Sequence, residues 1–427
     1  MKKVLLALAV AALLFSGCKG KETTQSGTQA QASAGTTLSI WNFTNEFENG
    51  MLAHYRATHP DVTIEHTFTN VSYNEKLGSA LVSGQGAPDL FGLNVDNART
   101  YFESGLLLDI TDIYEAYKDK LVKYQVEIGT VNGRVYGLSW QATPGGFYYR
   151  RSLAKKYLGS DDPDIVQTYL SDINKFMDTA VLLQSKSGGS CAIISGYDDM
   201  LYVFTPNRKQ PWIVNGQLTI DPVVLQYLDL CKTMHDKGYE ARITSWSENW
   251  FNSLKGIYKD ERGNQVDVFG YFLPTWGLHY AIKANAPDTS GDWGIVGGPL
   301  RYYAGGTFIG AYKNTKNPEA AKELIRYFTA DDVFLETWAK ESGDFVSNSY
   351  VNEKIKNDFS DPFIAGQNHY ALFAELAPYV NGTLTQGTDI AIGNIFLEAV
   401  TAYANNEKTK DQALADFKAQ VVSELSL

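Results

Sequence analysis

Side chains that can exchange hydrogen bonds with a polar ligand follow two strand-like runs in the first hundred residues. Trp41 ends the first run and Glu46 comes shortly after it, while Asn94 and Asp96 follow the run at 89–93. Open α/β sheets bind ligands beyond the carboxyl ends of their strands, so these four residues are candidates for one binding site. Carboxylates there would accept hydrogen bonds from ligand hydroxyl groups.

Two of these residues also have simpler structural explanations. Glu46 is a favourable charge if it lies in the first turn of a helix. Asp96 is suited to capping the helix that follows the second run. The sequence leaves both alternatives open.

Aromatic residues supply the second kind of candidate. The chain has eight Trp and 26 Tyr, and binding sites combine aromatic walls with a few polar groups. Trp140 and Tyr148 flank the Thr-Pro-Gly-Gly break at 143–146, where they line a cleft or pack in a core. Among later tryptophans, we favour Trp246, Trp250 and Trp276 as ligand-binding over Trp212 and Trp338. Trp338 falls within a helical apolar pattern typical of a core.

Signatures of enzymes and metal sites are missing from the sequence. HExxH, GxGxxG and GxxxxGK[ST] do not occur, and the six histidines are scattered. Cys191 and Cys231 have no CxxC partner, and either one disulfide or two separately buried thiols suits them. We therefore predict no catalytic residue, metal or cofactor. A glycosidase needs only two carboxylates, which the sequence does not exclude.

Length and charge narrow the class of protein. With 427 residues and 44% apolar content, the chain is too long for a single core, and two lobes are expected. The formal net charge of −11, with no clustered basic face, argues against nucleic-acid binding. No run beyond the first residues is apolar enough to span a membrane.

The N-terminus has the organisation of a secretory signal. Lys2 and Lys3 precede an apolar run at 4–15, and the small residues Ser16 and Gly17 lead to Cys18. Leu-Phe-Ser-Gly-Cys at 14–18 resembles the bacterial lipobox, with Phe at a position where Leu is usual. We predict a signal peptide at 1–17 and a lipid-anchored flexible linker at 18–36. A plain signal peptide that leaves a free Cys18 is the alternative.

Strand and helix patterns alternate through the rest of the chain. Alternating apolar residues predict strands at 38–41 and 62–68, and helical spacing predicts a helix at 73–81. The break at 143–146 predicts the first lobe boundary. Further expected elements are a helix at 164–186, a strand at 191–194, a helix at 222–237, a strand at 266–269, and helices from 317 and at 331–340. This order predicts an α/β protein with mostly parallel sheets covered on both faces.

Four segments in this order carry a resemblance to a known family. They are Gly84-Gln85-Gly86-Ala87-Pro88-Asp89-Leu90, Asn132-Gly133-Arg134-Val135-Tyr136-Gly137-Leu138, Gly146-Phe147-Tyr148-Tyr149-Arg150, and Gly305-Gly306 followed by Lys316-Asn317-Pro318-Glu319-Ala320-Ala321. The chain resembles family 1 extracellular solute-binding proteins, the sugar-binding components of bacterial ABC importers, with the maltose-binding-protein fold. One departure is Asp344-Phe345-Val346-Ser347, where the family usually has Pro.

The resemblance implies a periplasmic-binding-protein-like fold. Two lobes, each a central sheet flanked by helices, are joined by three crossing segments and close by hinge bending. The expected lobes are 37–144 with 304–345, and 145–303 with 346–427. The crossings are expected near 143–146, 301–305 and 344–347, which adds Arg301, Gly305 and Asp344 to the ligand-binding candidates. Family members often present a tryptophan where Trp276 stands.

The function implied is capture of a carbohydrate, in particular an oligosaccharide, for a membrane permease. The protein is expected to be a monomer outside the cytoplasm, attached to the membrane by its lipid anchor alone. Two other functions stay open, a carbohydrate-active enzyme and a sensor subunit that reports the sugar to a membrane kinase.

Overall fold

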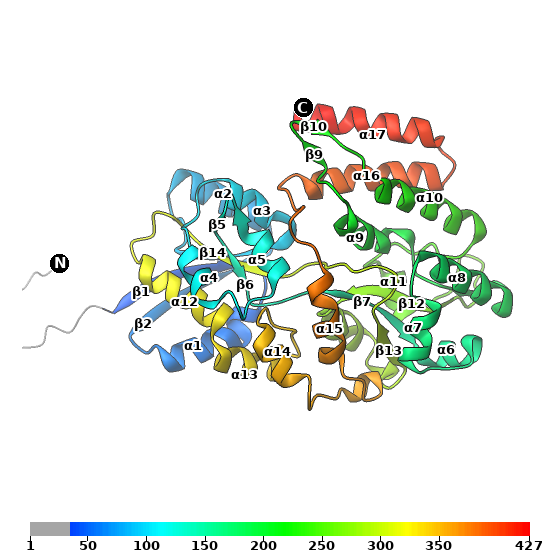
Figure 1. Ribbon diagram of the computed structural model, residues 1–427, viewed down its shortest axis with the longest axis horizontal. Helices are drawn as coiled ribbons and strands as arrows, with labels where there is room; N and C mark the ends of the chain where they lie inside the picture. The colour runs from blue at the N-terminus through cyan, green and yellow to red at the C-terminus, as the bar shows by residue number, and fades with distance from the viewer. Residues whose placement is uncertain (1–34) are drawn as a thin grey trace, which may run out of the picture. The chain divides into compact units, whose positions relative to one another are not determined.

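The computed structural model describes residues 35–427 (Figure 1). The predicted signal peptide, the lipidation of Cys18 and nearly all of the predicted linker lie outside the described residues. Within 35–427, no helix is long and apolar enough to cross a membrane.

The strands form two main sheets and several short pairs. Their bounds are β1 (Thr36–Asn42), β2 (Val62–Phe68), β3 (Leu90–Asn94), β4 (Thr130–Val131), β5 (Arg134–Val135), β6 (Leu138–Ser139), β7 (Gly145–Arg150), β8 (Cys191–Ala192), β9 (Ile213–Val214), β10 (Gln217–Leu218), β11 (Asp267–Val268), β12 (Gly270–Pro274), β13 (Trp293–Val296) and β14 (Thr307–Ala311).

Helices surround the sheets. Their bounds are α1 (Leu52–Thr58), α2 (Tyr73–Ser83), α3 (Val95–Glu103), α4 (Thr111–Tyr117), α5 (Lys123–Gly129), α6 (Arg151–Leu158), α7 (Pro163–Tyr169), α8 (Ile173–Ser187), α9 (Leu201–Phe204), α10 (Pro222–Lys237), α11 (Glu248–Leu254), α12 (Pro318–Ala330), α13 (Asp332–Ser342), α14 (Ser349–Ile355), α15 (His369–Leu376), α16 (Asp389–Ala404) and α17 (Lys410–Leu425). Shorter helical turns are η1 (Phe47–Met51), η2 (Tyr197–Met200), η3 (Thr205–Asn207), η4 (Gly277–Lys283), η5 (Pro287–Thr289), η6 (Pro362–Ile364) and η7 (Ala377–Tyr379).

The first sheet has the strand order β2-β1-β3-β14-β6. β1 pairs in parallel with β2 and β3, as the alternation of strands and helices predicts. β14 runs antiparallel to both of its neighbours, β3 and β6. Figure 1 shows α2 and α3 on one side of this sheet and α1 and α13 on the other.

The second sheet, β12-β7-β13, is antiparallel, so the prediction of mostly parallel sheets is wrong for it. The reason lies in how the chain enters each sheet. Gly145, at the start of β7, pairs with Pro274 at the end of β12, and Thr307, at the start of β14, pairs with Asn94 at the end of β3. A strand that follows a crossing segment starts at the edge where the other strands end, and therefore runs against them.

The three predicted crossing segments lie side by side. Ala142 N donates to Phe345 O at 2.8 Å, and Gly145 N donates to Tyr302 O at 2.8 Å. Ser347 N donates to Trp140 O at 2.8 Å. The segment around 140–145 is thus hydrogen-bonded to the other two, one on each side, which gives the two-lobed fold a three-stranded connection.

Two hydrophobic cores meet at β7. Because side chains alternate along a strand, Tyr148 packs into the core that also holds the first sheet, while Phe147 and Tyr149 pack into the second core. All three are fully buried. β7 therefore lies between the two cores and begins where the first crossing segment ends.

Local signals set most of the helix bounds. The α10 helix begins where the Asp221 side chain accepts from Val223 N at 3.0 Å and Pro222 takes the first turn, and it ends at Gly238 with a left-handed backbone. The single helix predicted at 164–186 is wrong, because it is two helices, α7 and α8. Asp172 starts the second one by accepting from Lys175 N at 2.9 Å.

Candidate functional site

Two adjoining cavities lie where the strands of the first sheet end. The larger, about 490 Å³, we call the aromatic cavity. Its lining combines the loop after β1, the end of β3, the turn after β12 and the start of β14. The lining residues are Phe43, Thr44, Asn45, Glu46, Asn94, Gln141, Trp276, Tyr280, Gly305, Gly306, Thr307 and Trp338.

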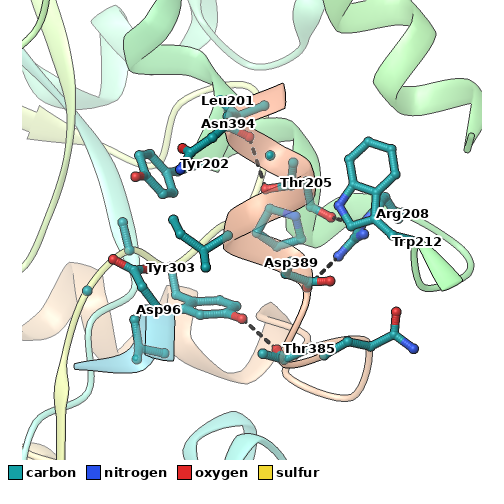
Figure 2. Close-up of a pocket in the computed structure, with 17 residues that line it drawn as sticks. Asp96, Leu201, Tyr202, Thr205, Arg208, Trp212, Tyr303, Thr385, Asp389 and Asn394 are labelled. Carbon is teal, nitrogen blue, oxygen red and sulfur yellow. Dashed lines mark hydrogen bonds and ion pairs between the residues drawn. The ribbon is translucent and has the colours of Figure 1, made fainter. Parts of the chain in front are cut away.

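The smaller cavity, about 100 Å³, we call the Arg208 cavity (Figure 2). It is lined by Val95, Asp96, Leu201, Tyr202, Thr205, Pro206, Arg208, Trp212, Tyr303, Ala304, Gly305, Thr385, Gln386, Asp389, Ile390, Gly393 and Asn394. Gly305 lines both cavities. Val95 lines the Arg208 cavity and Gly306 lines the aromatic cavity, and Val95 N donates to Gly306 O at 3.0 Å. The cavities are therefore neighbouring parts of one cleft.

Two carboxylates share one amide at the polar end of the aromatic cavity. Gln141 Nε2 donates to Glu46 Oε1 at 2.8 Å and to Asp344 Oδ2 at 3.2 Å. Trp338 Nε1 donates to the same Asp344 oxygen at 3.1 Å. Across the cavity, the Tyr280 hydroxyl donates to Glu46 Oε1 at 3.2 Å.

This arrangement favours the protonated forms of both carboxyl groups. Burial, followed by the charge of Asp344, raises the pKa of Glu46 to about 8. Burial also raises the pKa of Asp344. None of the residues that line the aromatic cavity is Lys, Arg or His. The cavity therefore offers hydrogen-bonding groups with no cation to hold a phosphate or carboxylate.

Trp276 forms the aromatic wall and is held from two directions. Its Nε1 donates to Ala304 O at 3.0 Å, in the second crossing segment. Trp246 stacks against its ring with centroids 5.8 Å apart and planes 27° apart. Gly305 has φ +68°, and a Cβ there would lie 2.8 Å from Trp276 Nε1, so glycine is required for this close approach.

The Arg208 cavity is built around an ion pair, shown in Figure 2. Arg208 Nη2 lies 2.9 Å from Asp389 Oδ2, at the start of α16, and Arg208 also lies over the Trp212 ring. The Tyr303 hydroxyl is 2.8 Å from Thr385 Oγ1, on the loop that precedes α16. Burial raises the pKa values of both Asp96 and Asp389.

Five of the sequence-predicted residues line these cavities. Glu46, Asn94 and Trp276 line the aromatic cavity, Asp96 lines the Arg208 cavity, and Gly305 lines both. Two more stand just behind them, because Asp344 is bridged to Glu46 by Gln141 and Trp246 stacks on Trp276. The capping role considered for Asp96 belongs to Asn94 instead, whose side chain accepts from Asp96 N at 3.0 Å.

The other five predicted residues line neither cavity. Trp140, Tyr148 and Trp250 have no exposed surface and pack within the core. Trp41 is partly buried against the same core. Arg301 directs its guanidinium to the carbonyl oxygens of Gly297 and Gly298, at 3.1 and 3.3 Å.

Several lining residues were not singled out from the sequence. Tyr280 lies one turn beyond Trp276, and Gln141 follows Trp140, so their position near predicted residues was the available signal. Arg208 and Asp389 are 181 residues apart, and only the fold brings them together. Trp338 is buried as expected and yet lines the aromatic cavity, and Trp212, the other less favoured tryptophan, is buried and lines the Arg208 cavity. Cys191 and Cys231 are free and buried, so the two separate thiols considered above are what the structure has.

Two lobes joined by three crossing segments, with a cleft beyond the strand ends, define the class of two-lobed binding proteins. Residues 50–361 match the family described as bacterial extracellular solute-binding protein. The chain belongs to this family.

Individual relatives agree with that assignment. The arabinooligosaccharide-binding protein of Bacillus subtilis (strain 168) is 22% identical over 450 residues, covering 97% of this chain and 98% of the relative. The lactose-binding protein of Rhizobium radiobacter is 25% identical over 377 residues, covering 83% and 86%. A crystal structure of an extracellular solute-binding protein of family 1 superposes with a TM-score of 0.79 at 19% identity, covering 90% of this chain and 98% of that one.

Proposed function

We propose that this protein binds a carbohydrate in the cleft formed by the aromatic and Arg208 cavities and delivers it to the membrane permease of an ABC importer. The observation that carries the proposal is the aromatic cavity, whose lining combines the Trp276 ring with a cluster of hydrogen-bonding groups and includes no basic side chain. Its volume of about 490 Å³ lies within the roughly 300–1,000 Å³ typical of small-molecule sites.

The chemistry of the lining suits a sugar. A sugar ring presents C–H groups on its faces and hydroxyl groups at its edge. Trp276 supplies a flat apolar surface for the faces. Glu46, Asn94 and Gln141 supply acceptors and donors for the hydroxyls. The names of the two relatives, which bind arabinooligosaccharides and lactose, support the same ligand class.

The proposal includes the arrangement of the whole chain. Lobe 1 is 37–144 with 304–345 and lobe 2 is 145–303 with 346–427, and solute shifts the population toward the closed form. The protein acts outside the cytoplasm as a monomer, held to the membrane by lipid on Cys18. The permease recognises the closed, loaded form.

Glu46, which lines the aromatic cavity, and Asp344 behind it do not suit glycoside hydrolysis. A glycosidase places its two carboxyl groups on either side of the scissile bond. Glu46 and Asp344 instead accept hydrogen bonds from a single nitrogen, Gln141 Nε2, which stands between them. A sugar cannot enter between two groups that the protein itself bridges, so Glu46 and Asp344 do not form the acid and base of a glycosidase.

Tryptophan fluorescence tests the proposal, because Trp276 lines the aromatic cavity and Trp246 stacks against Trp276. The protein is titrated with arabinose, arabinobiose, arabinotriose, galactose, lactose and maltose, and the mixtures are analysed for products. A saturable change with at least one sugar and no product is expected. Unchanged fluorescence with every sugar, or release of products, would contradict the proposed function.

A further inference from the structure

Two residues that line the Arg208 cavity each carry a buried polar atom without a partner in the described chain. Arg208 is 6% exposed, and its Nη1 has no hydrogen-bond partner within residues 35–427. The Oδ1 atom of Asp389 is likewise buried and unpaired in the described chain. The other atoms of both groups are satisfied, since Nη2 pairs with Oδ2 and Nε donates to Thr205 O at 2.8 Å.

Such a pair is unusual, because buried polar groups in proteins are nearly always hydrogen-bonded. One nitrogen that donates and one oxygen that accepts remain on the two halves of a single ion pair. A hydroxyl group is both donor and acceptor, so hydroxyls of a polyol can satisfy the two atoms at once. The guanidinium and the carboxylate neutralise each other, and the pair therefore calls for a neutral partner.

The surroundings provide room and a route for such a partner. The cavity of about 100 Å³ is several times larger than the roughly 10–15 Å³ that one water requires. Tyr202, 45% exposed, and Asp96 complete its wall. Gly305 belongs to the lining of both this cavity and the aromatic cavity, so the two cavities adjoin there.

We propose that the Arg208–Asp389 pair forms a second sugar subsite, which takes hydroxyl groups of a second glycosyl unit when the first unit occupies the aromatic cavity. This inference rests on the proposed function and adds the size of the ligand. The protein then selects a solute of at least two linked sugar rings, and a monosaccharide leaves the Arg208 subsite unused.

Calorimetric titration with matched sugars tests the inference. The pairs are galactose with lactose, and arabinose with arabinobiose and arabinotriose. We expect at least one of the longer sugars to bind about tenfold or more tightly than its monosaccharide, the effect of hydrogen bonds to charged groups. The Arg208→Lys variant keeps the charge opposite Asp389 but loses the planar second nitrogen. It should remove most of this preference and leave monosaccharide binding within about twofold.

Arg150→Lys is the matched control. Arg150 forms a similar ion pair with Asp292 at 2.6 Å, and neither residue lines either cavity. This variant should keep the preference for the longer sugar.

The outcomes separate the two proposals. If the unmodified protein binds a monosaccharide as tightly as its oligosaccharides, the second subsite is wrong while sugar binding stands, and this result needs no variant to fold. If Arg208→Lys weakens both sugars equally, or neither, the subsite is also wrong. If none of these sugars binds, the proposed function fails and the subsite falls with it.

Discussion

The hydroxyl of Tyr280 donates a hydrogen bond to Glu46 Oε1 at 3.2 Å, across the mouth of the aromatic cavity. Glu46 follows β1 of the first sheet, whereas Tyr280 follows β12 of the second. The contact therefore links the two sheets across the cleft. Burial of the Glu46 carboxyl couples the cleft to pH.

The free energy of unfolding should decrease as pH rises, because of Glu46. Its pKa is raised from 4.5 to about 8 in the folded protein, so the contribution of its neutral form is fully present below pH 4.5. This contribution is lost as pH rises toward 8, with a slope of about 1.4 kcal/mol per pH unit between the two values. Urea unfolding from pH 5 to 8 measures it.

Glu46→Gln is the control for this effect, because glutamine keeps the shape of the side chain and does not titrate. The free energy of unfolding of the variant should decline less steeply over this range than that of the unmodified protein. Parallel curves for the two proteins would show that Glu46 titrates normally.

Trp276→Ala should weaken binding of the sugar identified by titration by at least about 1 kcal/mol, because it removes the aromatic wall of the cavity. Calorimetry measures the loss. Trp293→Phe is the matched control, since Trp293 is fully buried and lines neither cavity. It should lower stability while leaving affinity unchanged. If a folded Trp276→Ala protein binds normally, Trp276 does not belong to the site.

Local patterns explain which parts of the fold the sequence predicts. Strand β2, helix α2 and helix α10 follow alternating or helical apolar spacing and lie where that spacing places them. The antiparallel direction of β7 and β14 was not predictable in this way. It depends on the direction from which the chain enters each sheet, and a crossing segment leaves no periodic signal.

The residues of the candidate site also differ in whether the local sequence predicts them. Glu46 and Asn94, which follow predicted strands, do line the cleft, because strand ends meet at one edge, and so does Trp276, which the family resemblance indicated. Trp140 and Trp250 have the same chemistry but are wholly buried, and nothing in composition distinguishes an aromatic wall from an aromatic core. The Arg208–Asp389 pair arises only from tertiary contact.

Asn94 and Asp96 should differ in how they affect stability and binding. Asn94 caps α3 by accepting from Asp96 N at 3.0 Å, so Asn94→Ala should lower the free energy of unfolding by about 1 kcal/mol, and it should also weaken sugar binding because Asn94 lines the aromatic cavity. Asp96 does not cap the helix but lines the Arg208 cavity, so Asp96→Ala should mainly weaken oligosaccharide binding. Thermal unfolding and calorimetry on both variants measure the two effects. An Asp96→Ala protein with reduced stability and intact affinity would reverse these assignments.

Cys191 and Cys231 should be unreactive in the native protein. Burial raises the pKa of Cys191 to about 12 and that of Cys231 well above its usual value, and the thiolate is the reactive form. Iodoacetamide at pH 8 should therefore modify the peptides that contain them only after unfolding in guanidinium, with or without prior reduction. Mass spectrometry of the digested protein measures the labelling of each peptide. Modification that requires a reductant even in guanidinium would reveal a disulfide between the two, and modification of the native protein would show that one of the thiols reaches solvent.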